Sequence, residues 1–410
     1  MKSCASMRFA TSAVLVLALC AGLARADVYE EVLRNAALEH GVGAELPAAP
    51  PVPTEMVEIG RRLFEDKRLS LNGNMACKTC HLDRFGSADG LPNAIGVGGI
   101  GEGPERAESD GLIVPRNTLP LWGRGSVGFD VLFWDGKVEK RDGHVVSQFG
   151  ELVPSEDPLV VAAHLPFVEI REMVLDTEAV IARYEAESVD AANGIYETLT
   201  ERVMADPWYR ENLPRAYSVS ADQVGFLHVV QAIAGFIRTK FALRPTRFHE
   251  FLAGREKLTH DEIRGGLLFY GKGRCASCHN GPLFSDLDFH VIPTVQTGFG
   301  KNGFGVDYGR FNVTHDPDDL YAFRTPPLIQ VDQTAPYGHS GSYATLEDVV
   351  IAHFDPLRSV DTRAMRNHER VEFYRRITAA KHTLSSVAWL DDGEIGQIVS
   401  FLRTLSMAPE

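Results

Sequence analysis

Two short segments of the sequence carry the side chains best able to do chemistry. Each has two cysteines separated by two residues and followed directly by a histidine: Cys77, Cys80 and His81 in the first, and Cys275, Cys278 and His279 in the second. Thiols at this spacing can add across the two vinyl groups of a haem, and the adjacent histidine then lies under the iron as its proximal ligand. The spacing therefore predicts two covalently attached haem c groups.

Other uses of paired cysteines fit less well. Either segment alone could form a disulfide, a zinc site or a thioredoxin-like redox pair. A zinc ribbon could use both pairs, but it would not need the histidine that follows each of them. The two segments also use every cysteine after residue 20. Haem in both places is the interpretation that accounts for all of these residues.

The N-terminus has the features of a secretory signal peptide. Lys2 and Arg8 precede an apolar run over residues 13–23, and an Ala-Arg-Ala cleavage site follows at residues 24–26. The mature chain is expected to begin at Asp27, in the periplasm of a bacterium, where c-type haem is attached. No later apolar stretch is long enough to span a bilayer, so no membrane insertion is expected.

The overall composition argues against some classes of partner. The chain has 410 residues, 44% of them hydrophobic and 23% charged, with a formal net charge of −14. This composition is typical of globular proteins, and the length suffices for two domains with separate cores. The acidic balance argues against nucleic acid or an anionic membrane as a partner. It would suit a basic docking protein, although solubility alone explains it.

The elements that must position the two segments are predicted to be mostly helical. Helical periodicity is expected over residues 28–40, 54–67, 158–164, 176–186, 194–204, 221–241, 258–270, 346–353, 363–379 and 391–405. Valine, isoleucine and threonine never alternate for long, and the Gly-rich segment between residues 85 and 110 has no helical or strand period. The expected fold is therefore mostly α, with long Gly-rich loops at the interface between two haem domains.

An internal repeat divides the chain into two modules. Gly60–Phe64 precedes the first cysteine pair and Gly265–Phe269 precedes the second, and both have the form Gly-x-x-Leu-Phe. A helix that leads into a haem-binding loop thus occurs twice. We expect a signal peptide (1–26), an N-terminal helix with a Pro-rich linker (27–53), and two cytochrome c-like domains (54–220 and 221–410).

Beyond residue 26, nearly the whole chain resembles the bacterial di-haem cytochrome c peroxidase and MauG family. The strings that carry the resemblance are GRRLFEDKRLSLNGNMACKTCH, PRNT, LFWDG, FIRTKFALRPTRFHEFLAG, GLLFYGKGRCASCHNGPLFSD, FRTPPLIQVDQTAPYGHSGSYATLEDVV and IVSFLRTL. The resemblance implies two cytochrome c-like domains with one haem each. One haem would react with hydrogen peroxide, and the other would pass or store electrons.

One departure from the family concerns the first haem. In the peroxidases, a histidine in the loop after the first haem ligates that iron in the resting state. Here no histidine occurs between His81 and His144. The resemblance then implies a five-coordinate first haem, as in MauG, and peroxide needs such an open sixth position.

A second departure concerns the other haem. Seven residues beyond the leucine of the TLEDVV-type string, the peroxidases place a methionine and MauG a tyrosine. Here the residue seven beyond Leu346 is His353, so the resemblance implies ligation by His279 and His353, with Met365 as the alternative. Two imidazoles stabilise ferric iron relative to histidine and methionine, so this haem is expected to have a lower potential than in the peroxidases.

The acid–base group of the peroxide reaction is left open among four residues. The family places a glutamine just before FWDG and a glutamate six residues after its glycine, where this chain has Leu132 and Asp142; aligning backwards from Glu172 and Met173 instead leaves Val161 opposite the glutamate. Cleavage of the O–O bond needs a group that moves a proton from one oxygen to the other. The candidates are Asp142, His144, Glu151 and His164, and we favour Glu151 and His144.

Two further roles follow from the resemblance. Trp122 matches the family's tryptophan between the haems, whose ring could carry a hole, and Trp134 is its rival. A calcium ion between the domains would be bound by Asp89 and by backbone carbonyls of Thr325 and Pro327.

The leading functional hypothesis is a periplasmic di-haem oxidoreductase that uses hydrogen peroxide. As a peroxidase it would take electrons from a small cytochrome c or a cupredoxin. As a MauG-like enzyme it would instead oxidise residues of a partner protein. A plain electron carrier is the alternative of another class, and it would require both irons to be six-coordinate. A homodimer is compatible with each hypothesis.

Overall fold

The computed structural model describes residues 28–408 except 151–152, 176–187, 297 and 387. The predicted signal peptide and the helix expected over residues 176–186 lie outside the described residues. The α-helices are α2 (Thr54–Glu65), α3 (Cys77–Cys80), α4 (Pro158–His164), α6 (Ser188–Met204), α7 (Pro207–Tyr217), α8 (Phe226–Lys240), α9 (Arg247–Leu252), α10 (His260–Tyr270), α11 (Phe311–Thr314), α12 (Leu346–Ala352), α13 (Asn367–Ala379), α14 (Lys381–Ser386) and α15 (Asp392–Arg403). None of the helices in this part of the chain is long and apolar enough to cross a membrane.

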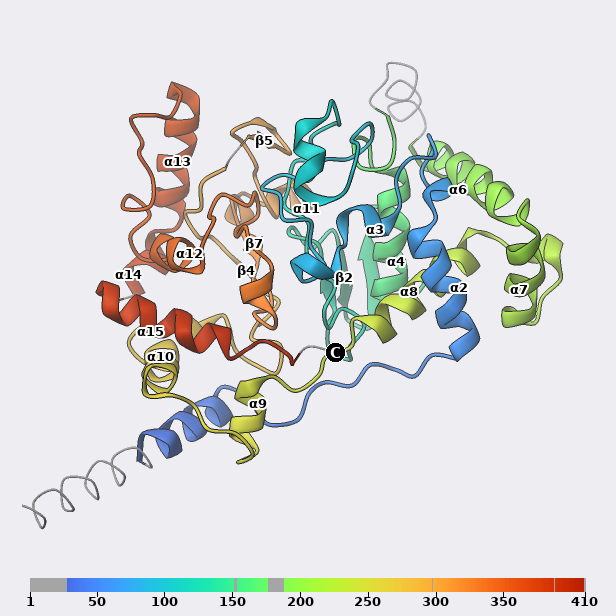
Figure 1. Ribbon diagram of the computed structural model, residues 1–410. Helices are drawn as coiled ribbons and strands as arrows, with labels where there is room; N and C mark the ends of the chain where they lie inside the picture. The colour runs from blue at the N-terminus through green and yellow to red at the C-terminus, as the bar shows by residue number, and fades with distance from the viewer. Residues whose placement is uncertain (1–27, 151–152, 176–187, 297, 387, 409–410) are drawn as a thin grey trace, which may run out of the picture.

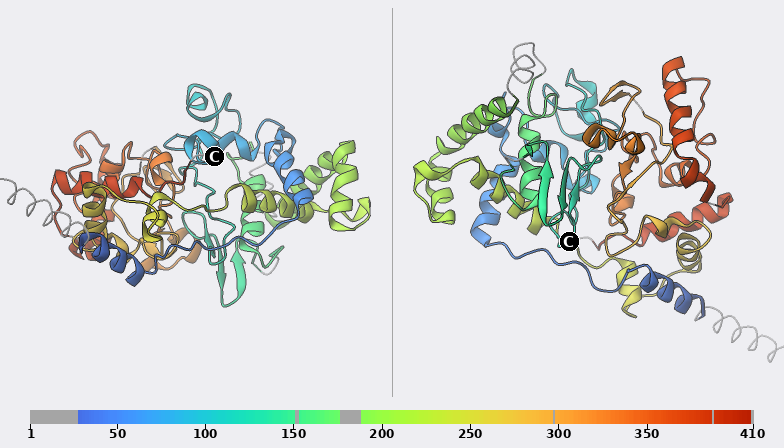
Figure 2. Two further views of the ribbon diagram at one scale, coloured as in Figure 1. Left: turned by 60° about the horizontal axis from the view of Figure 1, so that its bottom comes forward. Right: turned by 180° about the vertical axis from the view of Figure 1, so that it is seen from behind.

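Two mostly helical lobes lie side by side (Figure 1). One lobe contains α2, α4, α6, α7 and α8, and the other contains α10, α12, α13, α14 and α15. Residues 28–39 are helical and lie beside α9 and α10 (Figure 1). An extended segment then connects this helix to α2 in the other lobe (Figures 1 and 2). The mostly helical fold predicted from the sequence is confirmed.

In each lobe, the helix before the cysteine pair packs on a later helix through a glycine of the repeated Gly-x-x-Leu-Phe string. α2 packs on α8, where a Cβ added at Gly60 would lie 1.9 Å from the carbonyl oxygen of Ala232. α10 packs on α15, where a Cβ at Gly265 would lie 1.8 Å from the carbonyl oxygen of Gln397. Only glycine permits such close approach of two helix backbones. The sequence repeat is therefore also a structural repeat.

The cores of the two lobes divide the chain differently from the predicted boundary at residue 221. The apolar face of α8 packs with Ile59 and Leu63 of α2 in the first core, so the division follows Phe241. The second core instead includes Leu33 and Ala37, from the helix at residues 28–39. The prediction placed α8 with the helices that follow it and set residues 27–53 apart from both domains, whereas the apolar faces of these two helices are buried against helices more distant in the chain.

Three small antiparallel sheets were not predicted. They are β1 (Val131–Leu132), β2 (Val138–Arg141) and β3 (His144–Ser147); β4 (Phe289–His290) with β7 (Phe323–Arg324); and β5 (Phe299–Gly300) with β6 (Gly303–Phe304). Asp142 and Gly143 both have positive φ and form the turn between β2 and β3. Asp-Gly is a strong signal for a β-hairpin, and it could have predicted this turn from the sequence. This hairpin packs against α4 in a third core, which also contains Leu283.

Most helices agree with the sequence prediction to within a few residues. The helix over residues 158–164 has the predicted bounds, and the segment predicted as one helix over 221–241 is a short 3₁₀ turn followed by α8. α7 was not predicted, because Pro207 and Pro214 lie within it. A proline inside a helix removes one backbone hydrogen bond and usually ends the helix, so the pattern argued against one.

Candidate haem sites

The first cysteine pair and His81 form the N-terminal site. The pair lies on α3, and the backbone N–H of His81 donates to the carbonyl of Cys77 at 3.0 Å. Nδ1 of His81 lies 2.8 Å from the carbonyl oxygen of Ser87. A carbonyl can only accept, so Nδ1 carries the proton and Nε2 keeps its lone pair for a metal. Burial lowers the pKa of His81 to about 4, so the ring is neutral at pH 7.

The second cysteine pair and His279 form the C-terminal site. The backbone N–H of His279 donates to the carbonyl of Cys275 at 2.9 Å, and Nδ1 lies 3.0 Å from the carbonyl oxygen of Phe284. Burial, together with the nearby His353, lowers the pKa of His279 to about 4. The two sites therefore orient their histidines in the same way, by a hydrogen bond from Nδ1 to a carbonyl a few residues downstream.

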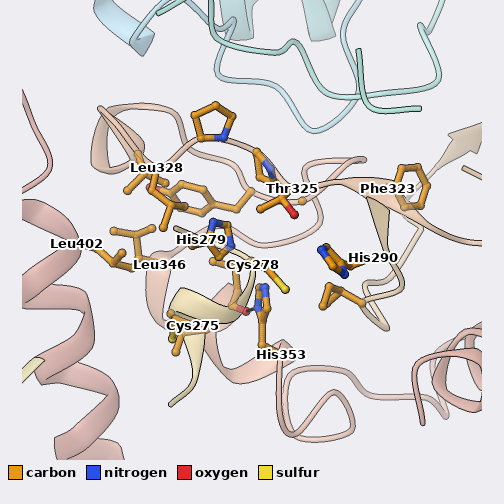
Figure 3. Close-up of a pocket in the computed structure, with 18 of the residues that line it drawn as sticks. Cys275, Cys278, His279, His290, Phe323, Thr325, Leu328, Leu346, His353 and Leu402 are labelled. Carbon is orange, nitrogen blue, oxygen red and sulfur yellow. Dashed lines mark hydrogen bonds between the residues drawn. The ribbon is translucent and has the colours of Figure 1, made fainter. Parts of the chain in front are cut away.

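His353 lines the same pocket as His279. It caps the C-terminal end of α12, and its Nδ1 lies 2.6 Å from the carbonyl oxygen of Val349. Figure 3 shows the rings of His279 and His353 entering the pocket from different elements, with Cys275 and Cys278 beside them and leucines around them. Both Nε2 atoms are thus available to one metal. The predicted alternative, Met365, lies in the turn before α13 and is not among the residues that line this pocket.

The four cysteines of the two segments are free, as attachment to the vinyl groups of haem requires. Burial raises the pKa of Cys77 and of Cys275 to about 12.

Trp122 lies between the two lobes. It packs against both main cores, its ring meets that of Phe241 edge-on at 5.4 Å, and it lines the pocket of the C-terminal site. Its buried Nε1 has no hydrogen-bond partner. Trp134 lines the same pocket, but its Nε1 donates to the carbonyl of Asn117 at 3.0 Å. Of the two, Trp122 has the position expected of a residue between two haems.

The four acid–base candidates lie in very different surroundings. Asp142 is exposed in the β2–β3 turn. The side chain of His144 is 81% exposed, with Nδ1 3.6 Å from Glu156. Glu151 lies outside the described residues. His164 alone is buried, only 3% exposed, among the rings of aromatic residues.

His164 repeats the setting of His353, a similarity that the sequence reading missed. Val160–His164 and Val349–His353 both have the sequence Val-Val-x-Ala-His. His164 is the last residue of a seven-residue helix, and His353 directly follows one. Nδ1 of His164 lies 2.8 Å from the carbonyl oxygen of Val160, four residues back, as in His353. α4 packs on α8 as α12 packs on α15. The repeated pentapeptide was the signal that could have found this pair.

The predicted calcium ligands have separate hydrogen-bond partners. The carboxylate of Asp89 accepts from the backbone N–H of Leu91 at 3.0 Å and from Oγ1 of Thr118 at 2.8 Å. The carbonyl of Thr325 accepts from Ser285 and Arg324, and Pro327 lines the pocket of the C-terminal site. Among the described residues no hydrogen bond joins Asp89 to Thr325 or Pro327. The calcium ion stays a prediction.

Comparison with known proteins finds one family. A family model described as di-haem cytochrome c peroxidase matches residues 54–257. The methylamine utilization protein MauG of Methylorubrum extorquens is 27% identical over 367 residues, which cover 88% of this chain and 81% of that protein. The cytochrome c551 peroxidase of Nitrosomonas europaea is 28% identical over 363 residues, covering 88% of this chain and 83% of that protein.

Solved structures give the same fold. A MauG-like protein associated with microbial copper homeostasis superposes with a TM-score of 0.64 at 26% identity, covering 88% of this chain and 93% of that one. The dihaem peroxidase BthA of Burkholderia thailandensis superposes with a TM-score of 0.62 at 20% identity, covering 90% and 92%. At that identity the second likeness supports the fold alone.

Proposed function

Because the chain belongs to the di-haem cytochrome c peroxidase and MauG family, we propose that it reduces hydrogen peroxide at the haem of the N-terminal site. Electrons would pass through the haem of the C-terminal site. The observation that carries the proposal is the difference between the two sites: His279 and His353 share the C-terminal pocket, whereas His164, the N-terminal counterpart of His353, lies among aromatic rings and lines a cavity that does not include His81. One iron would be closed and the other open.

The residues of the N-terminal site have a defined task in this reaction. Bound haem supplies a redox-active iron whose sixth position can take peroxide. His81 would hold that iron through Nε2, and the hydrogen bond from Nδ1 to Ser87 fixes the ring orientation and makes Nε2 a stronger donor. Peroxide reduction then takes two electrons and two protons and yields two molecules of water.

The residues of the C-terminal site suit electron transfer. His279 and His353 would both be ligands of the iron, and a haem with both positions taken by the protein would serve electron transfer rather than peroxide binding. Paired imidazoles favour ferric iron, so this haem would have a lower potential than one bound by histidine and methionine. Trp122, packed against both cores, is the residue best placed to connect the two haems.

For the acid–base group we infer His164 in preference to Glu151 and His144. The ring of His164 contacts Phe226 at the start of α8. The corresponding neighbour of His353 is Leu390, which lies just before α15 and lines the same pocket as His353. Burial lowers the pKa of His164, so the neutral ring keeps a lone pair on Nε2 that can accept a proton from peroxide. His164 also lines a cavity of about 680 Å³ between α4, α6 and α8, which would admit water to return that proton.

The peroxidase and MauG-like activities differ in where the electrons come from. A peroxidase draws two electrons from a small cytochrome c or cupredoxin, whereas a MauG-like enzyme draws them from residues of a partner protein. The likeness to MauG over 88% of the chain and the lack of a histidine after His81 favour the second. The several cytochrome c peroxidases among the relatives favour the first, which we place ahead.

A steady-state assay of the haem-loaded protein tests the proposal. With hydrogen peroxide and a reduced small cytochrome c or cupredoxin, we expect two donor molecules to be oxidised for each peroxide consumed. A donor-independent loss of peroxide accompanied by oxidation of a partner protein would favour the MauG-like activity. If peroxide is not consumed under either condition, the proposal is wrong and the chain is an electron carrier.

A further inference from the structure

Two arginines lie buried between the haem sites without a carboxylate. Arg124 is 8% exposed and Arg324 is 1% exposed, and within the described part of the chain neither forms an ion pair. Other buried arginines nearby do: Arg116 pairs with two aspartates, and Arg310 pairs with Glu139. A buried charge without a partner is strongly unfavourable, so the pair indicates an anion that binds here.

The hydrogen bonds of the two side chains leave one buried donor without a partner. Nε of Arg124 donates to the carbonyl of Pro120 at 2.5 Å. Nε of Arg324 donates to Phe133 at 2.9 Å and Nη1 to Thr325 at 3.0 Å, but the buried Nη2 has no partner. Both guanidinium groups lie near the ring of Phe129, at 5.8 and 5.6 Å.

A second unpaired donor belongs to the same pocket. The buried indole Nε1 of Trp122 has no partner, and Trp122, Arg124 and Arg324 all line the pocket that contains His279. Three buried groups that can only donate therefore surround one space. A group that can only accept, and that carries negative charge, would satisfy all three.

Backbone contacts place this space between the two sites. The backbone N–H of Leu121, three residues before Arg124, donates to Oγ of Ser87 at 2.8 Å, and the carbonyl oxygen of Ser87 lies 2.8 Å from Nδ1 of His81. Arg124 is thus connected to the N-terminal site although it lines the pocket of the C-terminal site. Arg324 also lines that pocket, and burial together with the positive charge of Arg324 lowers the pKa of Arg124 to about 9.

We propose that Arg124, Arg324 and Trp122 form one carboxylate-binding site that holds propionate groups of both haems. The cysteines fix the vinyl edge of each haem, so the propionates leave on the opposite edge as the only negative groups of the cofactor. Arg124 would take a propionate of the N-terminal haem and Arg324 one of the C-terminal haem. The two haem edges are thereby held against Trp122, which is where electrons must cross.

The proposal rests on both haems being bound but not on peroxide reduction. The test is a spectroelectrochemical titration of both haems in the haem-loaded protein, for the wild type and for Arg124→Gln and Arg324→Gln. Loss of a cation beside a propionate favours ferric iron. We expect the ferric-to-ferrous ratio at fixed potential to rise about tenfold, equivalent to about 59 mV for a one-electron couple. The larger shift should fall on the N-terminal haem for Arg124 and on the C-terminal haem for Arg324.

Three control variants separate charge from fold. Arg324→Lys keeps the positive charge and should keep most of the potential. Trp122→Phe keeps an aromatic ring but removes the N–H donor, and it should shift the potentials in the same direction by less. Arg363→Gln removes a guanidinium that is 90% exposed and should change neither haem.

The proposal is overturned if both Gln variants bind two haems and keep wild-type potentials. It is also overturned if Arg324→Lys shifts the potential as far as Arg324→Gln, because charge would then not be the cause. Should the Gln variants fail to bind haem, the Lys and Phe variants still decide the matter. Wild-type protein that consumes no peroxide but shows the expected shifts would refute the proposed function and leave this site intact.

Discussion

The N-terminal and C-terminal haem sites share one scaffold and differ on the side that faces the iron. Each has a helix that packs through a glycine, a short turn with two cysteines, and a histidine whose Nδ1 bonds a backbone carbonyl. Opposite the histidine, the C-terminal site has His353 in the same pocket, whereas in the N-terminal lobe the matching helix ends in His164 among aromatic rings. Under the proposed function, one repeated fold would hold one iron for electron transfer and another for peroxide.

The largest effect is expected from removing His353, because the C-terminal site would then lack the second histidine that distinguishes it from the N-terminal site. His353→Ala takes away the second imidazole, and we expect the C-terminal haem to change fully from low-spin to high-spin ferric iron, because an open sixth position weakens the ligand field. The optical and EPR spectra of the ferric protein measure this. Met365→Leu is the control and should leave the spectrum unchanged. An unchanged spectrum in His353→Ala would rule out His353 as the ligand.

Removing His164 should affect only the peroxide side. His164→Gln keeps a polar side chain of similar size but cannot take a proton, so we expect kcat/KM for peroxide to fall about 10²- to 10⁴-fold. The low-spin signal of the C-terminal haem should not change. The matched control is His144→Gln on the exposed hairpin, which should keep wild-type activity. The reverse result would restore His144 as the acid–base group.

The shared scaffold can be tested in both lobes at once. Gly60→Ala and Gly265→Ala each add a Cβ within 2 Å of a helix carbonyl, so each should lower the free energy of unfolding by about 1–3 kcal/mol. Gly396→Ala, in α15, meets nothing within 4 Å. It should instead stabilise the protein by up to about 1 kcal/mol. Denaturant unfolding of the haem-loaded variants measures all three, and equal stability of all three would contradict the close packing.

A smaller effect, on the pH dependence of stability, is expected at the ion pairs of Arg116. Arg116 pairs with both Asp135 and Asp307. Although burial acts to raise the pKa of Asp307, Arg116 lowers it to about 2, from 3.8 in an unfolded chain. A depressed carboxyl pKa stabilises the fold above the unfolded value, and this stabilisation is lost as the pH falls from about 4 to 2.

Substitution of that aspartate isolates its share of the pH dependence. Asp307→Asn cannot ionise, so its unfolding free energy should fall less steeply than that of the wild type between pH 4 and pH 2. Denaturant unfolding at several pH values compares the two slopes. Parallel slopes would mean that the carboxylate of Asp307 does not contribute to acid stability.

Local sequence patterns predicted the parts of the site that depend on neighbouring residues. Cys77, Cys80 and His81 lie within five residues, so their spacing alone indicates how a haem would be attached. The glycine of each Gly-x-x-Leu-Phe string proved to be the contact between two helices. His353 was found by its position relative to Leu346, and the structure brings it into the pocket of His279.

Features of the fold and the site that depend on contacts between residues far apart in the sequence were not predicted. α8 was predicted to lie in the second domain, but it packs on α2, which lies more than 150 residues earlier in the chain. No pattern along the sequence indicates that Arg124 and Arg324 are buried together, since surface and buried arginines look alike. The hairpin of β2 and β3 has strands of only four residues, too short for an alternating pattern to stand out.

The most direct test of the account is low-temperature EPR of the ferric haem-loaded protein, before and after addition of hydrogen peroxide. We predict one high-spin signal from an open N-terminal haem and one low-spin signal from a C-terminal haem with two histidine ligands. The high-spin signal should be lost on adding peroxide. Two low-spin signals that peroxide does not change would contradict it. They would mean that a sixth ligand, with His164 the first to examine, closes the N-terminal iron.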